Sequence, residues 1–228
     1  MKKGENPLNG RIVSVNIGTP KVVTWRGQTF STAIEKTPVN APVPVRGVNV
    51  GDDDQADRTV HGGRNKAVYA YAVADYSWWQ SREGIDPVPG LFGENLTTEG
   101  VDLGSCLIGE RWKAGSAVLE VSEPRLPCYK LGFRLRDAAF LSRFAKALRP
   151  GAYFRIVEEG WVGPGDTLTL LHRPEDHEVS IREVMRIRLF AHEERAKLAT
   201  VPALSAGYRD WAMLKPKEFD GSLGADDR

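Results

Sequence analysis

Several residue types and motifs are scarce or absent in this chain of 228 residues. It contains two cysteines, Cys106 and Cys128, and four histidines. His172, His177 and His192 stand in no metal-ligand spacing with either cysteine, so the sequence gives no sign of a structural zinc site. It also has no Gly-x-Ser-x-Gly elbow, no Walker loop and no recognisable motif for flavin, haem or an iron–sulfur cluster. The sequence therefore gives no sign of a serine hydrolase or of a P-loop nucleotide-binding protein.

The chain also lacks a net charge of one sign and a long apolar run. Its 31 Lys and Arg and 30 Asp and Glu residues leave a formal charge of +1, so neither nucleic acid nor a membrane is the expected partner. No window reaches the length of a membrane span, and residues 1–7 lack the apolar core of a signal peptide. We therefore expect a cytoplasmic protein in a reducing compartment, where both cysteines stay free thiols.

The first two thirds of the chain are rich in strand patterns. Residues 12–17 alternate between apolar and polar and run into a turn at 18–20, after which 22–25 is expected to return as a hairpin partner. Units of a turn followed by a strand recur at 109–121 and at 165–171. Such units at short spacing predict a closed or half-closed antiparallel sheet. The expected fold class is mainly β with added α.

Helical patterns interrupt this sheet and dominate the C-terminal part. Residues 74–82, which follow a strand at 67–71, and residues 137–148 are predicted to be helical. The capping box at 180–183 opens the first of three short C-terminal helices, which are too small to hold a core of their own and must pack on the β-rich part or on a second subunit. The predicted parts are a β-barrel domain at 1–175, a three-helix extension at 176–217 and a disordered tail at 218–228.

One cysteine lies in an unusual setting. Cys128 follows Pro124 and Pro127, which fix φ and favour extended backbone, so we expect its thiol on a stiff, non-helical segment. Arg125 and Lys130 flank it and favour the thiolate, the form that attacks electrophiles and binds soft metals. The alternative, an inert cysteine buried as a small hydrophobe, stays open on these residues alone.

Three further segments carry groups that could bind an anion or line a pocket. Residues 61–66, His-Gly-Gly-Arg-Asn-Lys, offer backbone N–H groups and cations for a phosphate, or form a plain glycine turn. In the glycine-rich segment 89–97, Glu94 and Asn95 either face a pocket or cap nearby backbone. Arg155, expected on the opposite strand face from Phe154, either clamps a phosphate or reaches solvent.

Taken together, these residues resemble the MOSC family, named for the molybdenum cofactor sulfurase C-terminal domain. The resemblance lies in the order and spacing of four segments: 61–69, 90–96, 109–112 and 124–131. It is to the bacterial stand-alone branch linked to resistance against 6-N-hydroxylaminopurine, whose members carry a three-helix extension after a MOSC-type β-barrel. Residues 180–214 match that extension in kind.

The resemblance implies a site and a reaction. Cys128 would be the catalytic residue and the thiolate ligand to molybdenum, and the pterin phosphate would be held around the glycine motifs. The candidate cofactor-binding residues are His61, Gly62, Gly63, Arg64, Lys66, Gly93, Glu94, Asn95, Arg125, Lys130 and Arg155. The molybdenum cofactor would serve to reduce N-hydroxylated compounds such as hydroxylaminopurine bases, with electrons from a separate reductase. A homodimer is considered as its assembly, and no nucleic acid or membrane partner is expected.

Two other functions stay open from the sequence. In one, the protein carries the molybdenum cofactor or sulfur without turnover, and Cys128 holds a persulfide or stores the pterin. In the other, Cys128 is the nucleophile of a metal-free enzyme and His61 is its base. Cys106 lies outside the matching segments and is read as structural.

Overall fold

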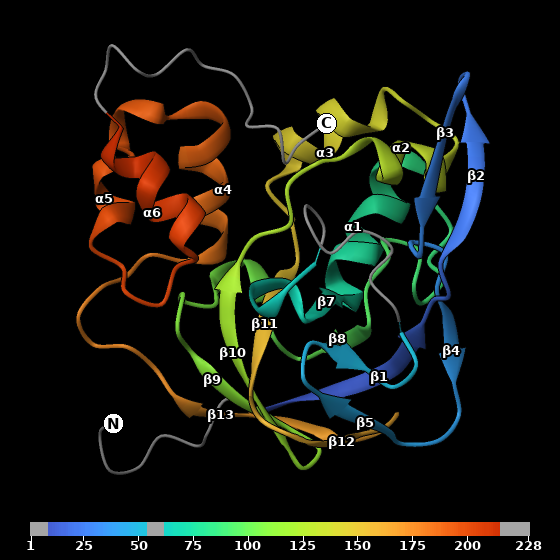
Figure 1. Cartoon of the computed structure of the whole chain (residues 1–228), viewed down its shortest axis with the longest axis horizontal. Helices are drawn as coiled ribbons and strands as arrows, with labels where there is room; N and C mark the ends of the chain where they lie inside the picture. Colours follow the sequence, from blue (N-terminus) through green and yellow to red (C-terminus); the bar gives the residue numbers. More distant parts are fainter. Residues whose placement is uncertain (1–8, 54–61, 215–228) are drawn as a thin grey trace.

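Seven strands form a closed barrel in the computed structural model, which describes residues 9–53 and 62–214 (Figure 1). The barrel strands are β1 (Asn9–Ile17), β7 (Val68–Ala72), β8 (Leu96–Glu99), β9 (Arg111–Ala114), β10 (Ala117–Glu123), β11 (Ala152–Glu158) and β13 (Thr167–His172). They are ordered β13-β9-β10-β11-β7-β8-β1, and β13 pairs back onto β1 to close the ring. The mainly β fold with added helices is therefore confirmed. The predicted tail at 218–228 lies outside the described residues.

Six further strands lie outside the ring. They are β2 (Lys21–Trp25), β3 (Gln28–Thr32), β4 (Thr37–Val39), β5 (Val43–Arg46), β6 (Asn49–Val50) and β12 (Gly160–Val162). The predicted pairing of 22–25 with 12–17 is wrong, because β2 pairs with β3 whereas β1 pairs with β4, β8 and β13. Arg26 and Gly27 both have positive φ, 49° and 80°, which makes a two-residue turn whose twist suits a hairpin. That turn, not the one at 18–20, reverses the chain.

One pair of barrel strands is parallel and needs a long connection. β7 and β8 run in the same direction, and the chain between them contains α1 (Val73–Glu83) and the glycine-rich loop 84–95. The helix predicted at 74–82 is confirmed as α1. The loop therefore returns across the outside of the barrel, where it meets the segment that carries Cys128.

Two short helices follow β10. They are α2 (Tyr129–Leu135) and α3 (Phe140–Ala147), and α3 lies within the helix predicted at 137–148. The chain is extended through Cys128, with φ −138° and ψ 156°, and turns helical at Tyr129. The prediction that the thiol of Cys128 sits on a non-helical segment is therefore confirmed, and the helix begins at the next residue. A proline restricts the residue before it but leaves those that follow free to start a helix.

The C-terminal helices cover one flank of the barrel (Figure 1). They are α4 (Ile181–Phe190), α5 (Ala196–Ala199) and α6 (Ala206–Met213). The Ser180 hydroxyl accepts a hydrogen bond from the Glu183 N–H at 3.2 Å, as the capping box predicts. Apolar side chains of these helices belong to the same buried cluster as the barrel interior. Within 9–53 and 62–214, no helix has the length and apolar character needed to cross a membrane.

A second buried cluster lies outside the barrel, between β7 and the helices α1, α2 and α3. Because side chains alternate along a strand, Val68, Ala70 and Ala72 of β7 fill the barrel interior while Tyr69 and Tyr71 point outward. The outward tyrosines meet an aromatic group from the helices and from the loop before β8: Tyr76, Trp79, Phe92, Phe133, Phe140 and Phe144. We call this group the outer cluster, and Cys128 belongs to it.

Candidate functional site

Cys128 lies where the extended segment after β10 meets α2. Its side chain is buried at 8% exposure within the outer cluster. The N–H of Leu131 donates to the Cys128 carbonyl at 2.9 Å, which closes the first turn of α2 and fixes the direction of the cysteine side chain. The sulfur is therefore held on a defined backbone between a barrel strand and a helix.

A buried arginine reaches the sulfur. Arg125 is 5% exposed, and its Nη2 lies 3.8 Å from Cys128 Sγ. Its Nη1 donates to the carbonyl of Phe92 at 2.5 Å, and its guanidinium lies 5.3 Å from the ring centroid of Tyr69. The guanidinium thus joins three segments that are far apart in sequence and places a positive charge against the sulfur. A positive charge at this position favours the thiolate over the thiol.

The charge of Arg125 is retained despite its burial. Burial lowers the pKa of this guanidinium, but the interactions with Cys128, Tyr69 and Tyr153 together outweigh that cost, so the pKa lies above its ordinary value. The arginine is therefore charged at every pH at which the protein is folded. The outer cluster is apolar in composition, yet a permanent cation lies beside Cys128.

Two tyrosines line the same region. The rings of Tyr69 and Tyr153 lie 4.9 Å apart, and the Tyr69 hydroxyl donates to the carbonyl of Pro150 at 2.7 Å. Burial raises the pKa of Tyr153; Arg125 and Lys66 act to lower it, whereas Cys128 and Glu123 act to raise it further. The phenol of Tyr153 therefore lies among the charged groups of the site, and both tyrosines stay neutral.

A β-bulge adds a buried carboxylate. In the pairing of β10 with β11, the register shifts between Val121 and Glu123, which brings Glu123 opposite Tyr153. Glu123 is 5% exposed, and its Oε1 lies 3.6 Å from the Nζ of Lys66. Burial raises the pKa of Glu123, against the charge of Lys66 and a hydrogen bond with the side chain of Ser205. Bulges commonly redirect a side chain beside an active site.

The segment that contains the glycine pair, residues 62–66, ends at Lys66, which pairs with Glu123. Gly63 has φ 87° and ψ −178°, a conformation that is essentially restricted to glycine, and a Cβ built on it would meet nothing within 4 Å. Gly62 is half-buried, Arg64 is exposed, and Lys66 ends the short helix η1 (Arg64–Lys66). The backbone at Gly63 is therefore open to close approach. The prediction for His61 falls outside the described residues.

In the glycine-rich segment 89–97, the side chain of Glu94 points into the protein. The carboxylate of Glu94 accepts hydrogen bonds from the Tyr76 hydroxyl at 2.5 Å, the Thr97 hydroxyl at 2.9 Å and the backbone N–H groups of Gly90 and Phe92 at 2.7 and 3.1 Å. Burial raises the pKa of Glu94, although these donors oppose the shift. Glu94 thus caps its own loop, the alternative that the sequence left open, and holds Phe92 where its carbonyl receives Arg125.

Gly93 and Asn95 also serve the packing of this loop. A Cβ on Gly93, at φ 76°, would lie 2.8 Å from Ile34 Cγ1. The Asn95 side chain accepts from the Tyr69 N–H at 3.1 Å and donates to Asp53 Oδ2 at 2.8 Å. The two residues therefore place the loop against the barrel, and their predicted contact with a cofactor stays a prediction.

Arg155 and Lys130 stay predictions as cofactor ligands as well. Arg155 lies on the opposite strand face from Phe154, as expected, since Phe154 is buried in the barrel cluster. Its guanidinium donates to Asn65 Oδ1 at 3.0 Å, to Glu120 Oε1 at 2.7 Å and to the carbonyl of Ala203 at 2.8 Å. These bonds tie η1, β10 and the C-terminal extension together. Lys130 is buried in the first turn of α2.

The structure thus brings Cys128, Arg125 and Lys66 to one region and adds residues that sequence reasoning missed. The missed residues are Tyr69, Tyr153 and Glu123. Tyr69 follows Lys66 and Tyr153 precedes Arg155, in segments whose side chains alternate between the two faces of a strand. That alternation is the signal that points to the two tyrosines. The bulge that redirects Glu123 has no signal in the sequence.

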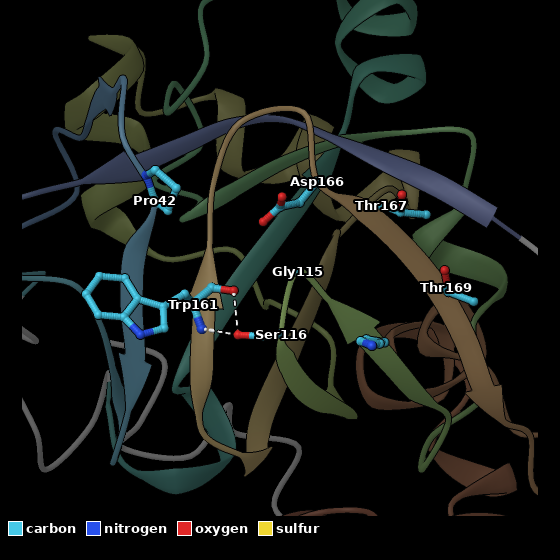
Figure 2. Close-up of a pocket in the computed structure, with 8 residues that line it drawn as sticks. Pro42, Gly115, Ser116, Trp161, Asp166, Thr167 and Thr169 are labelled. Carbon is cyan, nitrogen blue, oxygen red and sulfur yellow. Dashed lines mark hydrogen bonds between the residues drawn. The ribbon is translucent and has the colours of Figure 1, made fainter.

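Two other features of the described residues bear on the location of a site. No three His, Cys, Asp or Glu side chains among residues 9–53 and 62–214 come together as metal ligands. A pocket of about 560 Å³ lies among β9, β12 and β13, and Figure 2 shows Trp161, Asp166 and Ser116 at its wall. Ser116 is hydrogen-bonded to the backbone of Trp161 there. None of the predicted site residues that fall within 62–214 lines this pocket.

Comparisons with known proteins relate the chain to one family. The family model of the MOSC domain matches residues 57–169. The chain is 31% identical to YflK of Bacillus subtilis (strain 168) over 212 residues, which cover 93% of this chain and 96% of YflK. The crystal structure of YiiM from Geobacillus stearothermophilus has a TM-score of 0.73 and 32% sequence identity, covering 89% of this chain and 97% of that one.

A fungal protein shares part of its length with this chain. A protein of Gibberella moniliformis (strain M3125 / FGSC 7600) named "Reductase" is 34% identical over 172 residues, 74% of this chain. The match spans only 30% of the fungal protein.

Proposed function

Because this chain belongs to the MOSC domain family in its stand-alone, YiiM-type form, we propose that it is a molybdenum-cofactor-dependent reductase of N-hydroxylated compounds. The single observation that carries the proposal is the contact of Arg125 with Cys128, which favours the ionised form of a soft ligand. The reductase name of the fungal relative supports oxidoreductase chemistry.

The residues present fit such a cofactor. A lone thiolate supplies too few ligands to hold a bare metal ion, but one suffices for molybdenum that a dithiolene already holds. Cys128 would be that ligand. Gly63, Arg64 and Lys66 would hold the pterin phosphate, because the backbone at Gly63 is open to approach and Lys66 is 24% exposed.

The reaction is a two-electron reduction, R–NHOH + 2 e⁻ + 2 H⁺ giving R–NH₂ and water, with hydroxylaminopurine bases as the proposed substrates. When bound, the cofactor would supply the electron transfer to the substrate, and a separate flavin or iron–sulfur reductase would supply the electrons. The protein's own residues bind and orient. Arg125 holds the charge on Cys128, and the neutral phenols of Tyr69 and Tyr153 line the region without competing for the metal.

The test is anaerobic reduction of 6-N-hydroxylaminopurine to adenine, followed by chromatography. The protein is produced in cells that make the molybdenum cofactor, and a chemical reductant replaces the unknown donor. We expect the wild type and Cys106→Ala to form adenine and Cys128→Ala to form none. Cys106 is the matched control because it is the other free, buried cysteine.

Each other outcome has a meaning. Bound molybdenum without adenine formation would favour the cofactor or sulfur carrier. Turnover in molybdenum-free protein, together with alkylation of Cys128 by iodoacetamide, would favour the metal-free cysteine enzyme. Equal turnover in wild type and Cys128→Ala would refute the proposed role of the thiolate.

A further inference from the structure

Cleavage of an N–O bond with loss of water needs a proton donor, and among the described residues Glu123 is a buried carboxyl beside Lys66 and Tyr153. Resting on the proposed function, we propose that Glu123 donates the proton to the leaving hydroxyl of the N-hydroxylated substrate. Three observations support this role of Glu123: the bulge in β10, the contacts that Glu123 makes, and the hydrogen bonds and ion pairs that occupy Glu94 and Glu120.

The bulge aims Glu123 at the site. In regular pairing the side chains of β10 alternate, and Leu119 and Val121 belong to the barrel cluster. The register shift after Val121 places Glu123 on the outer face, directly opposite Tyr153. Cross-strand partners in this position have their Cβ atoms about 5 Å apart. The ring of Tyr153 lies 4.9 Å from that of Tyr69 at a tilt of 38°, and Arg125 lies over Tyr69 and reaches Cys128.

Four groups face Glu123 from the elements packed around it. Lys66 comes from η1, Tyr153 and Arg155 from β11, and Ser205 from the residue before α6. Lys66, Arg155 and the hydrogen bond with Ser205 favour the carboxylate. Burial acts in the opposite direction and is the largest effect, so the pKa of Glu123 is raised. The carboxyl therefore keeps its proton to a higher pH than an exposed glutamate does.

Two other carboxyl groups of the described residues, Glu94 and Glu120, are committed elsewhere. Glu94 accepts four hydrogen bonds from its own loop and from Tyr76. Glu120, three residues before Glu123, forms ion pairs with Arg111 at 2.8 Å and with Arg155 at 2.7 Å. Among the described residues, Glu123 instead forms a longer ion pair, at 3.6 Å, with a lysine that is itself partly exposed.

The step balances as follows. The N–O bond of R–NHOH breaks and the oxygen leaves as water. The separate flavin or iron–sulfur reductase supplies the two electrons, which the cofactor would deliver when bound. Glu123 supplies one proton to that oxygen and becomes a carboxylate. The second proton reaches the nitrogen from solvent. Lys66 is the first cation that the new carboxylate meets, and it connects Glu123 to the surface, from which the carboxyl regains its proton.

The test compares the pH profile of kcat in the loaded wild type, Glu123→Gln and the control Glu120→Gln. A proton donor contributes a factor of about 10² to 10⁴, so we expect kcat of Glu123→Gln to fall about a hundredfold with little change in KM. The wild-type kcat should decline as pH rises through the pKa of Glu123, and the variant should lose this decline. Glu120→Gln should keep it, and Glu123→Asp should restore part of the rate.

A second readout needs no cofactor and no turnover. Infrared difference spectra between wild type and Glu123→Gln should show the carbonyl stretch of a protonated carboxyl at pH values above the ordinary range of glutamate. In Lys66→Met that signal should persist to still higher pH, because Lys66 favours the carboxylate. A carboxyl that is already ionised at ordinary glutamate pH would overturn the inference.

Failure of the inference and failure of the proposed function are distinguishable. If the wild type reduces the substrate and Glu123→Gln matches it in kcat and pH profile, Glu123 is not the donor and the reductase proposal stands. If the loaded wild type does not reduce any N-hydroxylated substrate, the proposed function is wrong, and the role of Glu123 in that reaction falls with it.

Discussion

Arg125 Nη2 lies 3.8 Å from Cys128 Sγ, with Pro127 and one leucine between the two residues in sequence. The hydrogen bond that the guanidinium donates to the carbonyl of Phe92 holds it in place beside the sulfur.

The first prediction concerns the reactivity of the two cysteines. Replacing Arg125 by methionine removes the cation beside the sulfur, and we expect alkylation of Cys128 by iodoacetamide at pH 7 to slow by about tenfold. Mass spectrometry of the labelled peptide gives the rate. Cys106 is the internal control: burial raises its pKa well above the ordinary value, so it should stay unlabelled in both proteins. An unchanged rate at Cys128 would show that Arg125 does not favour the thiolate.

The second prediction separates a structural from a binding role of Glu94. Glu94→Ala leaves several buried donors without an acceptor and should lower the free energy of unfolding by about 3 to 5 kcal/mol. Tyr76→Phe removes one of these hydrogen bonds and should cost about 1 kcal/mol. Urea denaturation measures both. A Glu94→Ala protein as stable as the wild type would contradict the capping role.

The third prediction tests the close approach of the loop at Gly93. In Gly93→Ala the positive φ is strained for alanine and the new Cβ meets Ile34. The substitution should therefore lower the free energy of unfolding by about 2 to 4 kcal/mol. Gly27→Ala has a similar φ with nothing within 4 Å and should cost about 1 kcal/mol. Thermal or urea unfolding gives the difference between them. Equal losses would mean that the loop can move away from Ile34.

The fourth prediction concerns the acid stability of the C-terminal extension. The hydrogen bond from Arg186 is the main cause that lowers the pKa of Glu194 from its ordinary 4.5 to about 2, and Lys197 adds to it. Because this pKa is depressed, its contribution to stability is present above pH 4.5 and is lost as pH falls towards 2. The stability difference between wild type and Glu194→Gln should disappear over this window. Glu158→Gln, at an exposed position of β11, controls for the lost charge, and a difference that persists at pH 2 would contradict the prediction.

Much of the fold follows from local patterns in the sequence. The alternation at 12–17, the helix of α1 and the capping box at Ser180 are all set by residues close together in sequence, and each was found. The hairpin was assigned to the wrong partner because Gly18 and Pro20 are strong turn residues, whereas Arg26 with Gly27 is a less obvious pair. Pairing between distant strands, such as the closure of β13 on β1, has no local signal.

The candidate site likewise contains residues that could be predicted from the sequence and residues that could not. Cys128 and Arg125 share one segment, so their proximity was accessible to sequence reasoning. Glu94 and Asn95 stand in an equally distinctive motif, yet their side chains turn inward to hydrogen-bond the loop and the barrel, and a motif does not show which way a side chain faces. Tyr153 and Glu123 meet only through a bulged pairing between β10 and β11.

The most direct test of the central claim is the molybdenum content of purified protein from cells that make the cofactor. Metal analysis by mass spectrometry is applied to the wild type, Cys106→Ala and Cys128→Ala, with circular dichroism to confirm that each is folded. The account predicts close to one molybdenum per chain in the first two proteins and almost none in Cys128→Ala. Molybdenum retained in folded Cys128→Ala, or missing from all three, would contradict it.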